Sequence, residues 1–235
     1  VNRNAMLLAT AGEKVLCVDD DTVCKPHVHP DRVETLSFSR DKPQDVVPRL
    51  DVEKTIQHDL KPMQGCILDD HESLLGRGIN DLSREFLLKE DGLSQVNPSL
   101  ISLINFGRAK IYCGFSGLVG DSGSASTEAL FGMPKDQVAS LLNTEEGFRR
   151  HCSNRNITKV SEAFGMMPAR SCMTTFFSYD NTEVLPPFFP YFRMEDALFA
   201  KTLLACDADA HFGYLPHMLE HRPQEKRKAG NPDEG

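Results

Sequence analysis

The sequence predicts an α/β fold with a mixed, mainly parallel sheet flanked by helices, and three observations lead to this class. The run Val15–Val18 is apolar, has charged flanks and lacks alternation, which is typical of a strand buried on both faces of a parallel sheet. A segment of helix-forming composition, 2–11, precedes this strand. Three carboxylates, Asp19–Asp21, follow it, at the strand end where open α/β sheets bind their ligands.

Length and composition favour one globular domain. The 235 residues are enough for one substantial core, and we expect a single domain over 1–223 with a polar excursion at about 28–65 and a disordered tail at 224–235. The hydrophobic content of 40% and the charged content of 26% are ordinary for such a domain. The net charge of -8 argues against non-specific nucleic-acid binding, which requires a basic surface.

Two further features favour a cytoplasmic protein. No stretch approaches the ~18–20 apolar residues that cross a bilayer, and the first residues lack the pattern of a signal peptide. The seven cysteines are odd in number and widely spaced, without a CxxC pair. Free thiols in a reducing compartment fit this usage better than a disulfide framework or a zinc knuckle.

The remaining elements follow from local composition. The leading helix is expected to stop at Gly12, and Thr144 is a good cap for a helix over 144–151. Further helices are expected at 69–76, 81–88 and 197–206, strands at 110–115, 173–179 and 211–215, and a rigid apolar loop at 186–190. Because the chain reaches its first strand after only one helix, we expect the fold to be truncated at its N-terminus.

The acidic run Asp19–Asp21 is the first candidate for chemistry. Crowded carboxylates repel one another and raise each other's pKa unless a cation is present. A hard divalent metal that holds a phosphorylated ligand would resolve this repulsion. The alternative is a solvated acidic turn.

A second acidic pair, Glu195 and Asp196, directly precedes the predicted helix over 197–206. Asp196 is a good N-cap residue, and acidic side chains favour the positive end of a helix. The functional alternative is a general base that faces an acceptor hydroxyl, for which a side chain fixed at a helix start is well placed.

The third candidate is the segment His217-x-x-Glu220-His221, which matches the inverted zinc-peptidase signature. On a helix, the two histidines could hold zinc and the glutamate could act as base. Pro216 and Pro223 leave barely two turns, and the tail offers no structured third ligand. The alternatives are one histidine that completes the metal site of the acidic run, or surface histidines.

Two weaker motifs complete the inventory. Gly117–Gly123 is glycine-rich, follows a predicted strand and could cradle an anion with its backbone amides, or form a tight turn. It matches neither of the common phosphate-binding glycine patterns. The run Asp69–Glu72 has metal-ligand residue types, but consecutive residues point around a helix, so we interpret it as a solvated helix start.

Together these segments resemble a bacterial glycosyltransferase of the GT-A type, close to the family 2 enzymes. The residues that carry the resemblance are Arg3-Asn4, Asp19-Asp20-Asp21 as the family's DxD, Gly117 to Gly123, Met173 to Thr175, Leu185 to Phe188, Arg193 to Asp196, Leu215-Pro216 and His221. The resemblance covers roughly 2–223, and 31–60 contributes nothing to it. That Rossmann-like fold normally opens with βα units that bind the nucleotide base, and these are absent here.

The resemblance implies a metal-dependent inverting glycosyltransferase, which moves a sugar from a nucleotide-sugar donor to an acceptor hydroxyl. It implies Mn²⁺ or Mg²⁺ held by Asp21, Asp19 and His221, with His217 behind His221. It implies Asp196 as the base, a role that Glu195 could share or replace. The residues expected to bind substrate are Asp19, Asp20, Arg3, Asn4, Gly120, Asp121, Thr174 and Thr175, with the 186–190 loop on the acceptor side.

Three rival functions remain open at this point. The first is a zinc metallopeptidase that uses His217, Glu220 and His221. The second is a nucleotidyltransferase, which also places metal-binding carboxylates at strand ends but has no need of a base at 195–196. The third is a non-catalytic remnant that only binds a partner.

Overall fold

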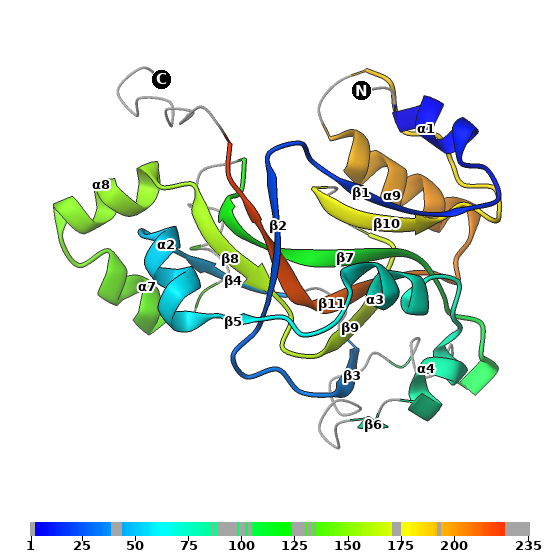
Figure 1. Cartoon of the computed structure of the whole chain (residues 1–235), viewed down its shortest axis with the longest axis horizontal. Coiled ribbons are helices and arrows are strands. Elements are labelled where there is room, and N and C mark those ends of the chain that lie inside the picture. The colour runs from blue at the N-terminus through cyan, green and yellow to red at the C-terminus, as the bar shows by residue number, and fades with distance from the viewer. Residues whose placement is uncertain are drawn as a thin grey trace.

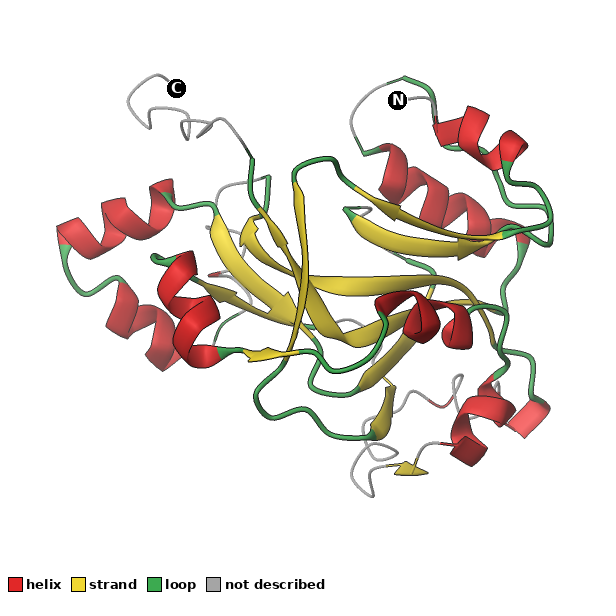
Figure 2. Ribbon diagram, viewed as in Figure 1, coloured by secondary structure: helices red, strands yellow, loops and turns green. Residues whose placement is uncertain are grey.

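The computed structural model describes residues 3–38, 44–85, 87–88, 98, 102, 105–123, 130, 133, 135–170, 175–191 and 194–223, and every structural statement concerns these. They form a mixed α/β fold in which helices surround a curled 11-stranded sheet (Figures 1 and 2). None of the described helices is long and apolar enough to cross a membrane.

Two long strands form the centre of the sheet. β7 (Lys110–Asp121) and β11 (Ala210–His221) are each 12 residues long, pair in parallel and are buried along almost their whole length. They lie side by side in the middle of the molecule (Figure 1). Both extend beyond the short strands that we predicted at 110–115 and 211–215, because neighbouring strands cover both ends of each.

The other strands surround this pair. The main path runs β1 (Lys14–Val18), β10 (Phe176–Asp180), β7, β11, β9 (Phe164–Pro168), β3 (Thr35–Phe38) and β6 (Leu87–Leu88). β2 (Thr22–Val28) pairs with the last residues of β11 and with β5 (Lys61–Pro62). β8 (Asn156–Val160) pairs with the last residues of β7 and with β4 (Asp45–Pro48).

The sheet is mixed and flanked by helices, as predicted, but the prediction that it is mainly parallel is wrong. Seven of the ten strand pairings are antiparallel and three are parallel. The run that suggested a parallel sheet is β1, which lies at one end of the strand order, antiparallel to β10 and only half-buried. An apolar run reports the burial of its side chains but carries no information about the direction of the partner strand.

The helices pack around the sheet. They are α1 (Arg3–Ala9), α2 (Val52–Lys54), a π-helical turn η1 (Thr55–Asp59), α3 (Ile67–Leu74), α4 (Ile79–Glu85), α7 (Lys135–Leu141), α8 (Glu145–Ser153) and α9 (Glu195–Cys206). Five of these described helices lie within three residues of their predicted bounds, whereas α2, η1 and α7 were not predicted. Gly12 follows α1 with φ +91°, and Thr144 caps α8 by accepting a hydrogen bond from the Gly147 amide. The tail 224–235, which we expected to be disordered, lies outside the described residues.

The core has two main parts, one on each side of the central strands. The first packs α9 and α1 against aromatic side chains of β7, β10 and β11, such as Phe115, Phe177 and Phe212. The second packs α3 and α4 against β3, β7 and β9, and includes Leu36 and Phe38. The stretch 28–65, expected as an excursion, therefore contributes two buried side chains to this second part.

Helix α3 lies very close to the sheet because glycines face it. A Cβ atom at Gly114 of β7 would lie 3.2 Å from His71 Nδ1, and one at Gly213 of β11 would lie 2.5 Å from Leu74 Cδ2. This close approach brings His71 of α3 into the interior, where it is 2% exposed. The expectation of a solvated helix start over Asp69–Glu72 is therefore wrong for His71.

Candidate metal centre

Three predicted metal ligands meet at one edge of the sheet. Asp19 and Asp21 lie in the turn between β1 and β2, and His221 is the last residue of β11. Thr22 of β2 pairs with His221 in the antiparallel β2–β11 ladder, so the turn lies directly beside the histidine. One ligand atom from each of the three side chains lies within 4.8 Å of the other two.

The orientation of the His221 ring is favourable for a metal ligand. Its Nδ1 lies 2.5 Å from the carbonyl oxygen of Asp121, which can only accept a hydrogen bond, so Nδ1 carries the proton. Its Nε2 points the other way and lies 2.8 Å from Asp21 Oδ1. In a neutral ring this nitrogen and the carboxylate are both acceptors, so a proton or a cation must lie between them.

Gly120 and Asp121 were expected to bind substrate, and the structure shows them supporting His221. Gly120 has φ +117°, and a Cβ atom there would lie 2.3 Å from the backbone oxygen of His221. The Asp121 carboxylate accepts hydrogen bonds from Arg155 Nε at 3.0 Å and from the Gly123 amide at 2.7 Å. Residues 117–121 belong to β7, so neither the anion-cradling loop nor the tight turn considered for Gly117–Gly123 is formed over these five residues.

The acidic side chains differ in their surroundings. Burial raises the pKa of Asp19 above its usual value, the nearby charges of Asp21 and Asp20 raise it further, and His221 and Arg3 oppose the shift. Asp20 is exposed and lies outside the three-residue cluster. A cation at this edge would offset the repulsion from Asp21 and Asp20, which adds to the larger effect of burial on the pKa of Asp19.

Arg3 lies between the acidic turn and the start of α9. Its guanidinium carbon is 5.9 Å from the ring centroid of Phe177 and 5.4 Å from that of Phe188. Its Nη1 is 3.7 Å from Glu195 Oε1 and is buried without a hydrogen bond to the described residues. Arg3 thus lies between two acidic elements that are far apart in the sequence, the turn at Asp19–Asp21 and the pair at 195–196.

Asn4 and Thr175 occupy supporting positions. The Asn4 amide donates to the backbone oxygen of Phe188 at 2.8 Å and accepts from its amide at 2.7 Å, which fixes the 186–190 loop on α1. The Thr175 carbonyl accepts from the Asp19 amide at 3.2 Å, so Thr175 borders the acidic turn. Thr174 was also expected to bind substrate, but it lies outside the described residues.

Helix α9 begins differently from the prediction. Its N-cap residue is Met194, in the left-handed region at φ 78°, and no side chain caps the helix there. Asp196 lies inside the first turn, where its Oδ1 accepts from the Ala197 amide at 2.8 Å. The structure therefore does not contain the simple N-cap, which was one of the two alternatives for Asp196.

The segment His217–His221 is part of strand β11 and not of a helix. The His217 side chain is completely buried and bonds to Ser116, and within the described residues the metal-capable group contains His221 but not His217. The helical geometry that a His-x-x-Glu-His zinc site requires is absent from this strand. His217 instead belongs to a cluster with His71 that the sequence analysis missed. In the sequence, the one indication of this cluster was the presence of isolated serines within apolar strands.

Comparison with known proteins adds no family to this description. No family model matches the chain, and no curated protein or solved structure shows significant similarity to it. Function must therefore be inferred from the geometry of the site itself.

Proposed function

We propose that this chain is a metal-dependent glycosyltransferase, which transfers a sugar from a nucleotide-sugar donor to an acceptor hydroxyl with inversion. One observation carries the proposal. His221 has its Nδ1 fixed on the Asp121 carbonyl, and its Nε2 faces Asp21 with Asp19 close by. This arrangement supports a cation site at the edge of a sheet, next to the half-buried Arg3 and a second acidic pair.

The donor atoms indicate the class of metal. Two carboxylates and one imidazole suit Mn²⁺, and the predominance of oxygen also allows Mg²⁺. When bound, such an ion stabilises the negative charge that develops on the leaving nucleoside diphosphate. Asp19, Asp21 and His221 would hold it, and Arg3 would contribute a fixed positive charge to the same phosphates.

The acceptor would be activated at the start of α9. The carboxylate of Asp196, or of Glu195, would take the proton of the acceptor hydroxyl, whose oxygen then bonds to the anomeric carbon. The bond from that carbon to the diphosphate oxygen breaks at the same time, and its electron pair leaves with the nucleoside diphosphate. Attack from the face opposite the leaving group inverts the anomeric centre.

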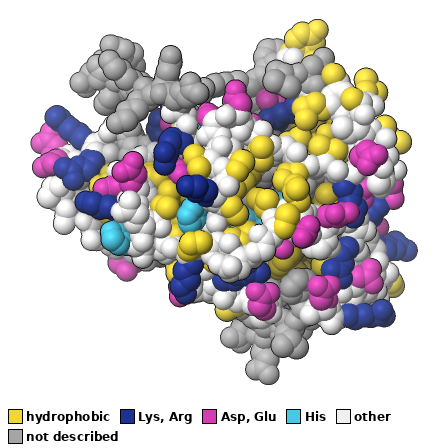
Figure 3. Space-filling view, in the orientation of Figure 1, with side chains coloured by type: hydrophobic (Ala, Val, Ile, Leu, Met, Phe, Trp, Pro, Cys, Tyr) yellow, Lys and Arg dark blue, Asp and Glu magenta, His cyan; other side chains and the backbone are white. Residues whose placement is uncertain are grey.

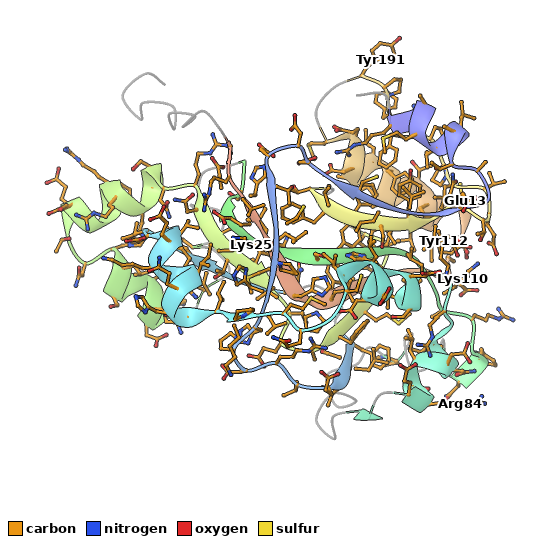
Figure 4. All side chains as sticks on the ribbon, viewed as in Figure 1. Glu13, Lys25, Arg84, Lys110, Tyr112 and Tyr191 are labelled. Carbon is orange, nitrogen blue, oxygen red and sulfur yellow. The ribbon has the colours of Figure 1, made fainter. Side chains whose placement is uncertain are left out.

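The acceptor side of the site has exposed aromatic side chains. Phe189 and Tyr191 are 45% and 70% exposed, and their rings are in perpendicular contact, with centroids 6.4 Å apart. Tyr191 projects outward from the segment that leads to α9 (Figure 4). Aromatic faces of this kind bind the apolar faces of ring-shaped acceptors.

The surface charge agrees with small-molecule substrates. On the face shown in Figure 3, the described basic and acidic side chains are interspersed, without a continuous basic surface. With the net charge of -8, this pattern does not favour a nucleic-acid substrate.

The first test measures binding of Mn²⁺ alone by titration calorimetry. We expect Asp21→Asn to weaken binding by more than the roughly 10–100-fold that loss of a group supporting a metal ligand costs. Asp20→Asn is the matched control, because it makes the same charge change in the same turn on a side chain outside the cluster. Equal affinities of wild type and Asp21→Asn would remove the acidic turn from the proposed site.

The second test concerns the reaction. Wild-type protein is incubated with nucleoside-diphosphate sugars and Mn²⁺, and release of the nucleoside diphosphate is measured with and without chelator. Metal-dependent release that is lost in Asp21→Asn supports the transferase. Tight zinc that survives dialysis, together with peptide cleavage, would favour the peptidase alternative instead.

A further inference from the structure

A buried chain of polar side chains links helix α3 to three strands. His71 of α3 has its Nδ1 2.7 Å from Ser178 Oγ of β10 and its Nε2 2.8 Å from Ser116 Oγ of β7. Ser116 Oγ is also 2.9 Å from Nε2 of His217 on β11. We call His71, Ser116, Ser178 and His217 the buried histidine cluster.

The hydroxyl of Ser116 contacts Nε2 of both His71 and His217. Because this hydroxyl has one proton to donate, at least one of the two nitrogens must donate to it. His217 Nδ1 lies 3.3 Å from Asp70 Oδ2 but forms no hydrogen bond within the described residues. The Ser178 hydroxyl can donate either to His71 Nδ1 or to the Gly114 carbonyl.

The order Ser116, His217, Asp70 has the composition of a hydrolytic triad, but it does not fit that function. Ser116 is 9% exposed, and its hydroxyl lies between two imidazole rings whose centroids are 5.7 Å apart. Both sides of the oxygen are occupied, so no substrate carbonyl could approach it. A role in holding the neighbouring strands in place explains the cluster better.

The register of β11 near its end depends on side chains. The β7–β11 ladder is irregular between Tyr214 and Met218, and the β2–β11 ladder is irregular between Met218 and Glu220. The two histidines, His217 and His221, bond to Ser116 and to the Asp121 carbonyl, both on β7. The β7–β11 ladder is thus interrupted beside His217, where the bond to Ser116 ties β11 to β7, and it is regular from Met218 to His221.

The cluster also reaches the strand that leads to the acidic turn. Ser178 of β10 pairs with Leu16 of β1, and β1 continues directly into Asp19. Through His71, Ser178 and Ser116, one connected set of hydrogen bonds therefore joins the strands that carry both halves of the metal site.

We infer that His217, acting through Ser116, is a positioning residue for the metal ligand His221. The inference rests on the proposed function, because it assumes that Asp19, Asp21 and His221 bind a divalent cation. It assigns to the buried histidine cluster the task of fixing β11 on β7, so that His221 Nε2 faces Asp21.

The test measures Mn²⁺ affinity in the full chain for two pairs of variants. His217→Asn keeps an amide near the position of Nδ1 but cannot reach Ser116, whereas the His217→Gln amide reaches the position of Nε2. We expect His217→Asn and Ser116→Ala to weaken Mn²⁺ binding by roughly 10-fold or more, as for loss of groups that orient metal ligands, and His217→Gln to restore most of it. The control is His211→Gln, a buried histidine of the same strand whose Nδ1 contacts the Asp209 carbonyl.

A merely structural role predicts a different result. Then His217→Asn and His211→Gln would lower the melting temperature and leave the Mn²⁺ affinity of the folded protein unchanged, which overturns the inference. Positioning also predicts that Ser116→Ala has no further effect on Mn²⁺ affinity once His221→Ala has removed the ligand. If His217→Asn does not fold, Ser116→Ala gives the same answer. If wild type binds no Mn²⁺, the proposed function itself fails.

Discussion

Acid should destabilise this protein strongly, and His71 should contribute a separable share of the effect. Burial, followed by the neighbouring His217, lowers the pKa of His71 from 6.5 to about 3. In the unfolded chain the same ring takes up a proton near its ordinary pKa. The unfolded state therefore binds more protons between these two values, and the folded state loses stability as the pH falls through that window.

The size of the effect follows from the shift. The lowering of the His71 pKa from 6.5 to about 3 corresponds to a free-energy difference of roughly 5 kcal/mol, at about 1.4 kcal/mol per pKa unit. This contribution is fully present above pH 6.5, and it is lost progressively down to pH 3 at about 1.4 kcal/mol per pH unit. Burial also lowers the pKa values of His27, His151 and His211, so the wild-type slope includes their protons too.

The assay is urea unfolding at a series of pH values from about 7.5 to 4.5, within the window of a histidine. His71→Gln should be less stable than wild type at neutral pH but should lose about 1.4 kcal/mol less per pH unit below pH 6. Ser178→Ala is the matched control, since it removes the hydrogen bond to His71 Nδ1 and keeps the titrating ring. Parallel slopes for wild type and His71→Gln would refute the reasoning.

Three further predictions concern the site. Gly120→Ala should lower the melting temperature and weaken Mn²⁺ binding. The reason is that φ +117° strains any other residue by about 1–3 kcal/mol and that the new Cβ atom meets the backbone of His221. An unchanged melting temperature and an unchanged Mn²⁺ affinity would contradict this prediction. Asp196→Asn should reduce turnover on the order of 10²-fold with little change in melting temperature, whereas near wild-type turnover would move the base to Glu195. Arg3→Gln should raise the KM for the nucleotide-sugar donor by about tenfold or more, the value of a charge-assisted contact, and leave the affinity for Mn²⁺ alone within about twofold.

Local sequence was sufficient for several elements. Helix α1, its stop at Gly12, strand β1 and the capped helix α8 all lie close to where composition placed them. Each depends on interactions within a few residues, such as the Thr144 side chain on the Gly147 amide. A pattern read along the chain contains all the information that such elements require.

Strand pairing was beyond local sequence. Glycines in 117–123 suggested a loop, but Gly117 and Gly120 allow other chain segments to approach β7: a Cβ atom on either would lie 2.3 Å from a backbone oxygen, of Lys159 and of His221 respectively. His71 looked like part of a solvated helix start, yet Gly114 on a distant strand gives it space inside the core. Such space depends on which segments pair, and no local pattern reports it.

By itself, the sequence determined which side chains could form the candidate site: an acidic turn after a short strand, and a histidine near the end of the described chain. The resemblance to glycosyltransferases suggested that Asp19, Asp21 and His221 act together. Only the tertiary structure decided that they meet, because the β2–β11 ladder joins residues from opposite ends of the chain. It also decided which His221 nitrogen is available, since that depends on a carbonyl oxygen of β7.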